Sequence, residues 1–356
     1  MVATAHRRGV CRRSISAGGV RHCLESVGDS GISNFEGAPQ MTRVLDHEEL
    51  LTELDGTLEA NLNRHLSMAK EWHPHDYVPW DLGRNFAAMG GQDWSLEQSS
   101  LSELARTAMI TNLLTEDNLP SYHRGLADNF SLDGAWGTWV GRWTAEENRH
   151  GIVMRDYLVV TRAVDPVELE RARMHHMTVG IDAPMDGANF LHSVAYVTFQ
   201  ELATRVSHRN TGLACGDPVA DRMLARVAAD ENLHMIFYRN LGEASLDLVP
   251  DQMVRAITDV ATDFQMPGLN MPNFRKNAMT LAKHGIYDLR QHLDEVLMPV
   301  LRKWKIFERD DFTGEGERDR DRLAAFVEDL AEKATKFEES RDRLLAREAA
   351  RAEKAS

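Results

Sequence analysis

Two four-residue motifs place a carboxylate and an imidazole at the same spacing. They are Glu147-Asn148-Arg149-His150 and Glu231-Asn232-Leu233-His234, and the pattern Glu-x-x-His occurs nowhere else in the chain. Positions i and i+3 of an α-helix lie on one face, so each motif would offer both side chains to the same point in space. One copy would carry little weight, because surface ion pairs with this spacing are common. Two copies predict a shared metal site.

A further glutamate precedes each motif at nearly the same distance along the chain. One glutamate from each of two helices, with a Glu-x-x-His motif from each of two others, forms the ligand set of di-iron and di-manganese carboxylate bundles. Four carboxylates would neutralise two divalent cations, and buried carboxylates without a cation are costly. Oxygen-rich ligands favour iron or manganese over zinc or copper. The predicted metal ligands are Glu116, Glu147, His150, Glu201, Glu231 and His234.

Two neighbours of these ligands have side chains suited to act near the metals. Asp230 directly precedes Glu231, and metal-bound histidines usually donate their second N–H to a carboxylate. We therefore expect Asp230 to accept from His150; the alternative is an exposed aspartate. Thr204 follows Glu201 by about one helical turn. Its hydroxyl would either reach the metals or bond to the carbonyl four residues earlier, which is common in helices.

Apolar residues at helical spacing predict the elements that would carry these ligands. Helices are expected at 46–68, from about 102 past Glu116 to 130, at 133–161, from 165, at 189–209 and from 217. An aromatic loop is expected at 72–96, shorter helices at 251–264, 273–284 and 288–304, and a last helix at 318–352. The pairs Asp165-Pro166 and Asp217-Pro218 are typical helix starts. No stretch alternates as a strand, so the chain is predicted to be all-α.

The two ends differ from the centre of the chain. Residues 1–40 are rich in Arg, Ser and Gly and show no sustained apolar period. They predict either a targeting peptide or, as we favour, a start assigned upstream of Met41; in both cases disorder is expected. Residues 41–317 form the predicted catalytic domain. Residues 318–356 form a highly charged helix that is expected to pack on the body or on a second subunit.

Composition excludes several classes of function. The 356 residues carry a net charge of −14, and 43% of them are hydrophobic. This charge argues against binding to nucleic acid or to anionic membranes. No apolar run approaches the roughly 20 residues that span a bilayer. The three cysteines are too few for a disulfide framework, so we expect a cytoplasmic protein.

Several longer motifs are specific enough to indicate a known family. They are Thr115-Glu116-Asp117-Asn118-Leu119-Pro120-Ser121-Tyr122, Trp143-Thr144-Ala145-Glu146-Glu147-Asn148-Arg149-His150-Gly151, Thr198-Phe199-Gln200-Glu201-Leu202-Ala203-Thr204, Ser207-His208-Arg209-Asn210-Thr211 and Ala229-Asp230-Glu231-Asn232-Leu233-His234. These motifs resemble those of the soluble acyl-[acyl-carrier-protein] desaturases, and the resemblance covers roughly residues 45–317. The actinobacterial branch is the most similar, through Asn63-Arg64-His65-Leu66-Ser67-Met68 and Pro74-His75-Asp76-Tyr77.

The resemblance implies a ferritin-like bundle with extra helices, a homodimer, and two iron ions held by the six predicted ligands. It also implies acyl carrier protein as the carrier of the substrate and a ferredoxin-like electron donor. It gives Thr204 a role in oxygen activation and places Asp230 and Trp72 on an electron path. One departure is Gly125, where plant enzymes have a bulkier residue; we hypothesise that it widens the acyl channel, and a close helix contact is the alternative.

The resemblance therefore implies O₂-dependent desaturation of a carrier-bound acyl chain, in fatty acid or long-chain envelope lipid synthesis. The alternatives are a di-iron hydroxylase or N-oxygenase, and a ferritin-like protein that only binds iron. Because the carrier and this chain are both acidic, docking would need a local basic patch. The candidates are Arg275, Lys276, Arg302, Lys303 and Lys305.

Overall fold

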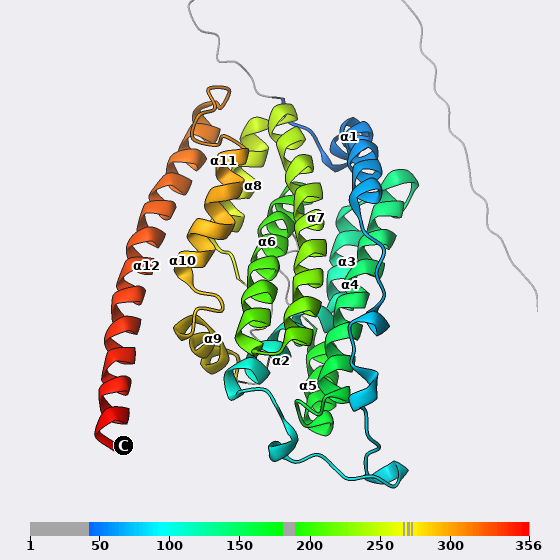
Figure 1. The fold of residues 1–356 in the computed structure, drawn as a ribbon. Coiled ribbons are helices and arrows are strands. Elements are labelled where there is room, and N and C mark those ends of the chain that lie inside the picture. The colour runs from blue at the N-terminus through cyan, green and yellow to red at the C-terminus, as the bar shows by residue number, and fades with distance from the viewer. Residues whose placement is uncertain (1–42, 181–188, 266–267, 269–270, 272, 356) are drawn as a thin grey trace, which may run out of the picture. The chain divides into compact units, whose positions relative to one another are not determined.

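Four long helices form the centre of the protein. The computed structural model describes residues 43–180, 189–265, 268, 271 and 273–355, and no strand occurs among these residues. The central helices are α2 (Glu103–Asp117), α4 (Gly134–Val160), α6 (Phe190–Cys215) and α7 (Pro218–Leu248). Helix α4 packs against both α2 and α7, and α6 does the same. Helices α6 and α7 run side by side over most of their length (Figure 1). The predicted all-α bundle is confirmed.

Shorter helices surround this bundle. They are α1 (His47–Met68), α3 (Leu119–Asn129), α5 (Pro166–Val179), α8 (Pro250–Thr262), α9 (Phe274–Lys283), α10 (Leu289–Gln291) and α11 (Met298–Lys303), with a π-helical segment η5 (His292–Leu297). The segment predicted as an aromatic loop at 72–96 contains three 3₁₀ turns, η1 (Pro74–Asp76), η2 (Trp80–Leu82) and η3 (Ala87–Met89), and a fourth, η4 (Leu96–Gln98), begins at its end. None of the described helices is long and apolar enough to cross a bilayer.

The helix starts follow the capping signals of the sequence. Asp46 accepts from the backbone N–H of Glu49, and the Glu49 side chain accepts from the backbone of Asp46, which makes a capping box at α1. Asp165 and Asp217 cap α5 and α7, each with a proline in the first turn. The predicted starts of both helices are therefore confirmed.

The helix that carries Glu116 is shorter than predicted. It ends at Asp117, and α3 begins at Leu119 after a turn at Asn118. Pro120 has no N–H to donate to the carbonyl of Glu116, and its ring would crowd that carbonyl in a continuous helix. The single helix expected over about 102–130 was wrong, and the interruption lies directly after the ligand.

Helix α12 (Gly314–Ala355) extends along the outside of the bundle, at the left edge of Figure 1. Its first half packs on α8 and includes the buried side chains Leu323, Leu330 and Ala334. Its second half is mostly exposed, and Arg341 and Glu348 form ion pairs with Asp288 and Lys283. The helix begins slightly earlier than the predicted position 318. The expectations for residues 1–40 lie outside the described part of the chain.

Candidate metal centre

All six predicted ligands point into the middle of the bundle. Glu116 comes from α2, Glu201 from α6, and the two Glu-x-x-His motifs from α4 and α7. Each of the six side chains is at least nine-tenths buried. Their ligand atoms form two groups, each lying within 4.8 Å: Glu116, Glu147, His150 and Glu231 in one, and Glu147, Glu201, Glu231 and His234 in the other.

Glu147 and Glu231 belong to both groups, and each turns one oxygen toward each histidine. Glu147 Oε2 lies 3.5 Å from His150 Nδ1, and its Oε1 lies 2.8 Å from His234 Nδ1. Glu231 Oε1 lies 3.2 Å from His150 Nδ1, and its Oε2 lies 3.9 Å from His234 Nδ1. Two cations, one beside each histidine, could therefore share these two carboxylates. Each histidine presents Nδ1 to the centre.

Glu116 and Glu201 each belong to one group and each has one oxygen held from outside. His208 Nε2 lies 2.8 Å from Glu116 Oε1, and the indole N–H of Trp143 donates to Glu201 Oε1 over 2.8 Å. The other oxygen, Oε2, faces His150 at 3.7 Å in Glu116 and His234 at 3.4 Å in Glu201. These contacts leave one oxygen of each carboxylate available to a metal.

Several buried polar atoms that face the centre make no hydrogen bond of good geometry, although Glu147 Oε1 and His234 Nδ1 lie 2.8 Å apart. They are Glu147 Oε1, His150 Nδ1, Glu201 Oε2, Glu231 Oε1 and His234 Nδ1. Buried polar groups are normally paired. Burial raises the pKa of Glu231, and the charges of Glu147, Glu201 and Glu116 raise it further. Two divalent cations would give these atoms partners and offset the repulsion, so the donor set fits a pair of hard metal ions.

Asp230 contacts the outer nitrogen of His150, as predicted. His150 Nε2 lies 3.5 Å from Asp230 Oδ2, which also accepts from the indole N–H of Trp72 over 2.7 Å. Burial by itself would raise the pKa of Asp230, but the hydrogen bond and charge of His150, with the charges of His234 and Arg226, lower it to about 2. Asp230 therefore stays ionised, and the exposed alternative is wrong. Trp72 also lies nearly parallel to the ring of His150.

Glu146 has the corresponding position for the other histidine, and the sequence reasoning missed it. Glu146 Oε2 lies 3.0 Å from His234 Nε2 and 2.8 Å from His65 Nε2. Its Oε1 pairs with Arg142 and lies 3.6 Å from Arg149. These two arginines already offset the charge of Glu146, so it needs no third metal ion, although the ligand atoms of His65, Glu146 and His234 lie close together. The missed signal is the acidic residue that directly precedes each motif.

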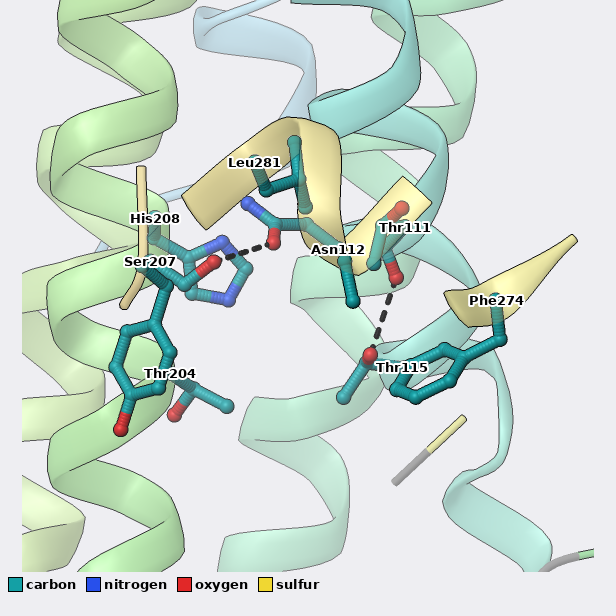
Figure 2. A pocket seen from close by; sticks show the side chains of 10 residues that line it. Thr111, Asn112, Thr115, Thr204, Ser207, His208, Phe274 and Leu281 are labelled. Carbon is teal, nitrogen blue, oxygen red and sulfur yellow. Dashed lines mark hydrogen bonds between the residues drawn. The ribbon is translucent and has the colours of Figure 1, made fainter. Parts of the chain in front are cut away.

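Thr204 makes the expected backbone contact and also contacts the carboxylate of a predicted ligand. Its Oγ1 lies 3.0 Å from the carbonyl of Glu201, 3.2 Å from that of Gln200, and 3.2 Å from Glu231 Oε2. It also faces a cavity of about 90 Å³ between α2, α6 and α9, where Figure 2 shows it opposite Thr115. The hydroxyl is thus placed between a shared carboxylate and open space.

Cavities lined by described residues adjoin the predicted ligands. The cavity beside Thr204 is lined by Thr111, Asn112, Thr115, Thr204, Ser207, His208, Phe274, Ala278, Leu281 and Tyr287 (Figure 2). Several of its polar groups bond to each other, as Ser207 does to Asn112, so its exposed lining is largely apolar. A second cavity, of about 350 Å³, reaches Glu116 from α4 and α5. Gly125 lies on α3 and not on the helix of Glu116, which was expected to continue to residue 130. It is half-buried and lines neither of these two cavities.

The fold defines a ferritin-like helical protein, and its centre holds buried groups of Glu and His side chains that could bind metal. Known proteins give the family. The model of the family described as fatty acid desaturase matches residues 46–355. The chain therefore belongs to the fatty acid desaturase family, as its motifs indicated.

Individual relatives agree with this assignment. The chain is 56% identical over 322 residues to DesA1 of Mycobacterium tuberculosis, named as an acyl-[acyl-carrier-protein] desaturase, with 89% of this chain and 95% of the relative covered. It is 30% identical over 314 residues to stearoyl-[acyl-carrier-protein] 9-desaturase 6 of Arabidopsis thaliana, covering 83% and 78%. The solved structure of DesA2 from Mycobacterium tuberculosis matches with a TM-score of 0.64 and 32% identity, covering 78% of this chain and 99% of that one.

Proposed function

We propose that this chain desaturates an acyl chain carried on acyl carrier protein, using O₂ and two iron ions bound by the six buried ligands. The observation that supports this most directly is the pair of ligand groups that share Glu147 and Glu231. The names of DesA1 and of the plant stearoyl desaturase supply the acyl-carrier substrate. When bound, the iron ions would supply the O₂ activation that amino-acid side chains cannot provide.

The overall reaction fixes what the protein must position. One hydrogen leaves each of two adjacent methylenes, and O₂ is reduced to two waters with two further electrons and two protons. Neighbouring methylenes are chemically alike, so only the depth of the chain in its channel selects between them. In this proposal the Thr204 hydroxyl donates to Glu231 Oε2, at the point where the cavity adjoins the ligands. The carboxylates Asp230 and Glu146 orient the two histidines.

The cavity beside Thr204 is the proposed path of the acyl chain. Helix α9 forms one wall of it with Phe274, Ala278 and Leu281. The same helix exposes Arg275 and Lys276 on its outer surface. An acidic carrier that docks on these two cations would stand next to the cavity. Arg302, Lys303 and Lys305, the other candidates, lie at the end of α11, near the opposite end of the bundle from α9 in Figure 1.

Electrons are proposed to enter through Trp72 and Asp230. Trp72 joins Asp230 by a hydrogen bond, and Asp230 joins His150. The guanidinium of Arg149 lies 4.8 Å from the centre of the Trp72 ring, and Arg226 pairs with Asp230. Both arginines are partly exposed. They would attract an acidic ferredoxin-like donor to this surface.

A homodimer is proposed from exposed apolar side chains on α4 and α5. Ile152, Met174 and Met177 are 41%, 61% and 43% exposed, and Ile152 and Met177 border the same cavity. Contiguous exposed apolar surface marks interaction sites. Light scattering should give about twice the chain mass of 40.2 kDa. A cage-sized particle would instead favour a ferritin-like iron-binding protein.

Turnover with mass analysis tests the proposed reaction. The protein would be supplied with iron, O₂, a ferredoxin reducing system and acyl carriers of several chain lengths. Loss of two hydrogens from the acyl chain is expected. Gain of an oxygen atom would instead indicate a hydroxylase. An unchanged acyl chain with every carrier, from a protein that has bound its iron, would contradict both enzyme assignments.

A further inference from the structure

Two hydrogen-bonded arms support the histidine ligands from outside. The Asp230 arm runs from Trp72 through Asp230 to His150, with contacts of 2.7 Å and 3.5 Å. The Glu146 arm, which comprises His65, Glu146 and His234, has contacts of 2.8 Å and 3.0 Å. In each arm a ring nitrogen and the outer nitrogen of a ligand contact the same carboxylate oxygen. The carboxylate of the Glu146 arm lies closer to its ligand histidine than the carboxylate of the Asp230 arm does.

The arms are built alike in two further respects. The outer ring stacks on the ligand ring in both: Trp72 and His150 are 6.3 Å apart at 10°, and His65 and His234 are 5.7 Å apart at 21°. The second oxygen of each carboxylate pairs with an arginine one turn earlier on the same helix, Arg226 for Asp230 and Arg142 for Glu146. Asp230 and Glu146 are almost fully buried.

Arg149 connects the two arms. Its Nη2 lies 3.3 Å from Asp230 Oδ2 and 3.6 Å from Glu146 Oε1. If the Glu146 carboxylate is displaced, it can move toward two cations on the side of its Oε1 atom. These are Arg142 and Arg149. His65 is the contact that holds Oε2 on the side of His234.

We infer that His65 is a positioning residue for the ligand His234, acting through Glu146. The inference rests on the proposed metal centre. A histidine that donates its Nε2–H to a fixed carboxylate keeps the Nδ1 lone pair directed at the metal. Without His65, Glu146 Oε2 loses one of its two partners and turns toward the arginines. His234 then loses its orientation, whereas His150, supported by the other arm, keeps its own.

The test compares two substitutions at His65 with a control on the same helix. His65→Leu removes the contact to Glu146, and His65→Gln can restore it with its amide N–H. Asn63→Ala changes an exposed residue of α1. Iron affinity would be measured by chelator competition, and crystals of each iron-loaded protein would give the anomalous peak heights at the two metal positions.

His65→Leu should weaken binding at the His234 position by about 10- to 100-fold, the usual effect of losing such a partner. In the same variant the anomalous peak at the His150 position should remain. His65→Gln should recover most of the lost iron affinity, and Asn63→Ala should bind iron as the unaltered protein does. Equal loss of iron at both positions in His65→Leu, or no loss at either, would overturn the inference. If His65→Leu does not fold, His65→Asn decides, because its shorter amide does not reach Glu146 and it should give the same one-sided loss. An unaltered protein that binds no iron would instead contradict the proposed metal centre.

Discussion

Trp143→Phe removes a single N–H donor from a carboxylate of the proposed metal centre. Trp143 is 3% exposed on α4, and its indole donates to Glu201 Oε1 over 2.8 Å. Phenylalanine keeps an aromatic ring at this position but cannot donate. Glu201 is 1% exposed, so water does not readily replace the lost donor. The substitution therefore leaves a buried carboxylate oxygen without its partner.

The size of the effect follows from the kind of hydrogen bond. A buried hydrogen bond to a charged group contributes about 1.5–3 kcal/mol. If that loss falls on the metal-bound protein, iron affinity decreases by about 10- to 150-fold, since about 1.4 kcal/mol is tenfold. The loss of ring volume adds a separate packing cost. Trp136→Phe, on the same helix and 4% exposed, makes the same change of volume away from the ligands and corrects for it.

The assay is a chelator competition with ferrous iron, combined with urea unfolding of the metal-free proteins. Trp143→Phe should bind iron more weakly than Trp136→Phe, and the two should differ in iron affinity by the factor above. The unfolding data separate packing loss, which both variants share, from loss of metal binding. Equal iron affinities in the two variants would refute the reasoning that the indole N–H supports Glu201.

Three further predictions concern other parts of the chain. Gly151→Leu should destabilise the protein by about 1–3 kcal/mol in urea unfolding, because a Cβ at Gly151 would lie 3.3 Å from an oxygen of Asp117 and 3.8 Å from Glu116 Cβ. The control is Gly141→Ala, on the same helix with open space around it, which should raise the free energy of unfolding by about 0.5–1 kcal/mol. Burial lowers the pKa of His292 to about 4, below the value near 6.5 of an unfolded chain. Between these two values the unfolded chain binds a proton that the folded protein does not. The free energy of unfolding should therefore be highest above pH 6.5 and decrease by up to about 3 kcal/mol as the pH falls toward 4. Unfolding free energies of His292→Gln should lack that dependence, and an unchanged pH profile would contradict the assignment. Gly125→Met should leave the preferred acyl chain length unchanged in product analysis, because Gly125 lines neither cavity; a shift to shorter chains would restore the channel hypothesis.

The clustering of the six candidate ligand side chains was predictable because their spacing reflects helix geometry. A carboxylate and an imidazole three residues apart lie on one helix face, and two such motifs with preceding glutamates rarely arise from surface ion pairs alone. Asp230 followed from the need of a bound histidine for an acceptor. The same reasoning applied to Glu146, which precedes the other motif. It was missed because an acidic doublet in a helix is usually exposed.

The remaining supports could not be read from local spacing. His208 lies far along the chain from its partner Glu116, and His65 and Trp143 likewise meet carboxylates on other helices. Only packing brings these pairs together, and a single sequence does not give it. The break after Asp117 had a signal in Pro120, but the apolar period continued through it. Helical periodicity was therefore given too much weight against proline geometry.

The number of iron ions bound per chain tests the central claim most directly. Titration of the metal-free protein with ferrous iron under anaerobic conditions, followed by removal of loosely bound metal, gives this number. The shared carboxylates predict two ions for the unaltered protein. They also predict loss of both in Glu147→Ala, because Glu147 belongs to each ligand group. One ion per chain, or two ions that Glu147→Ala still retains, would contradict a centre bridged by Glu147 and Glu231.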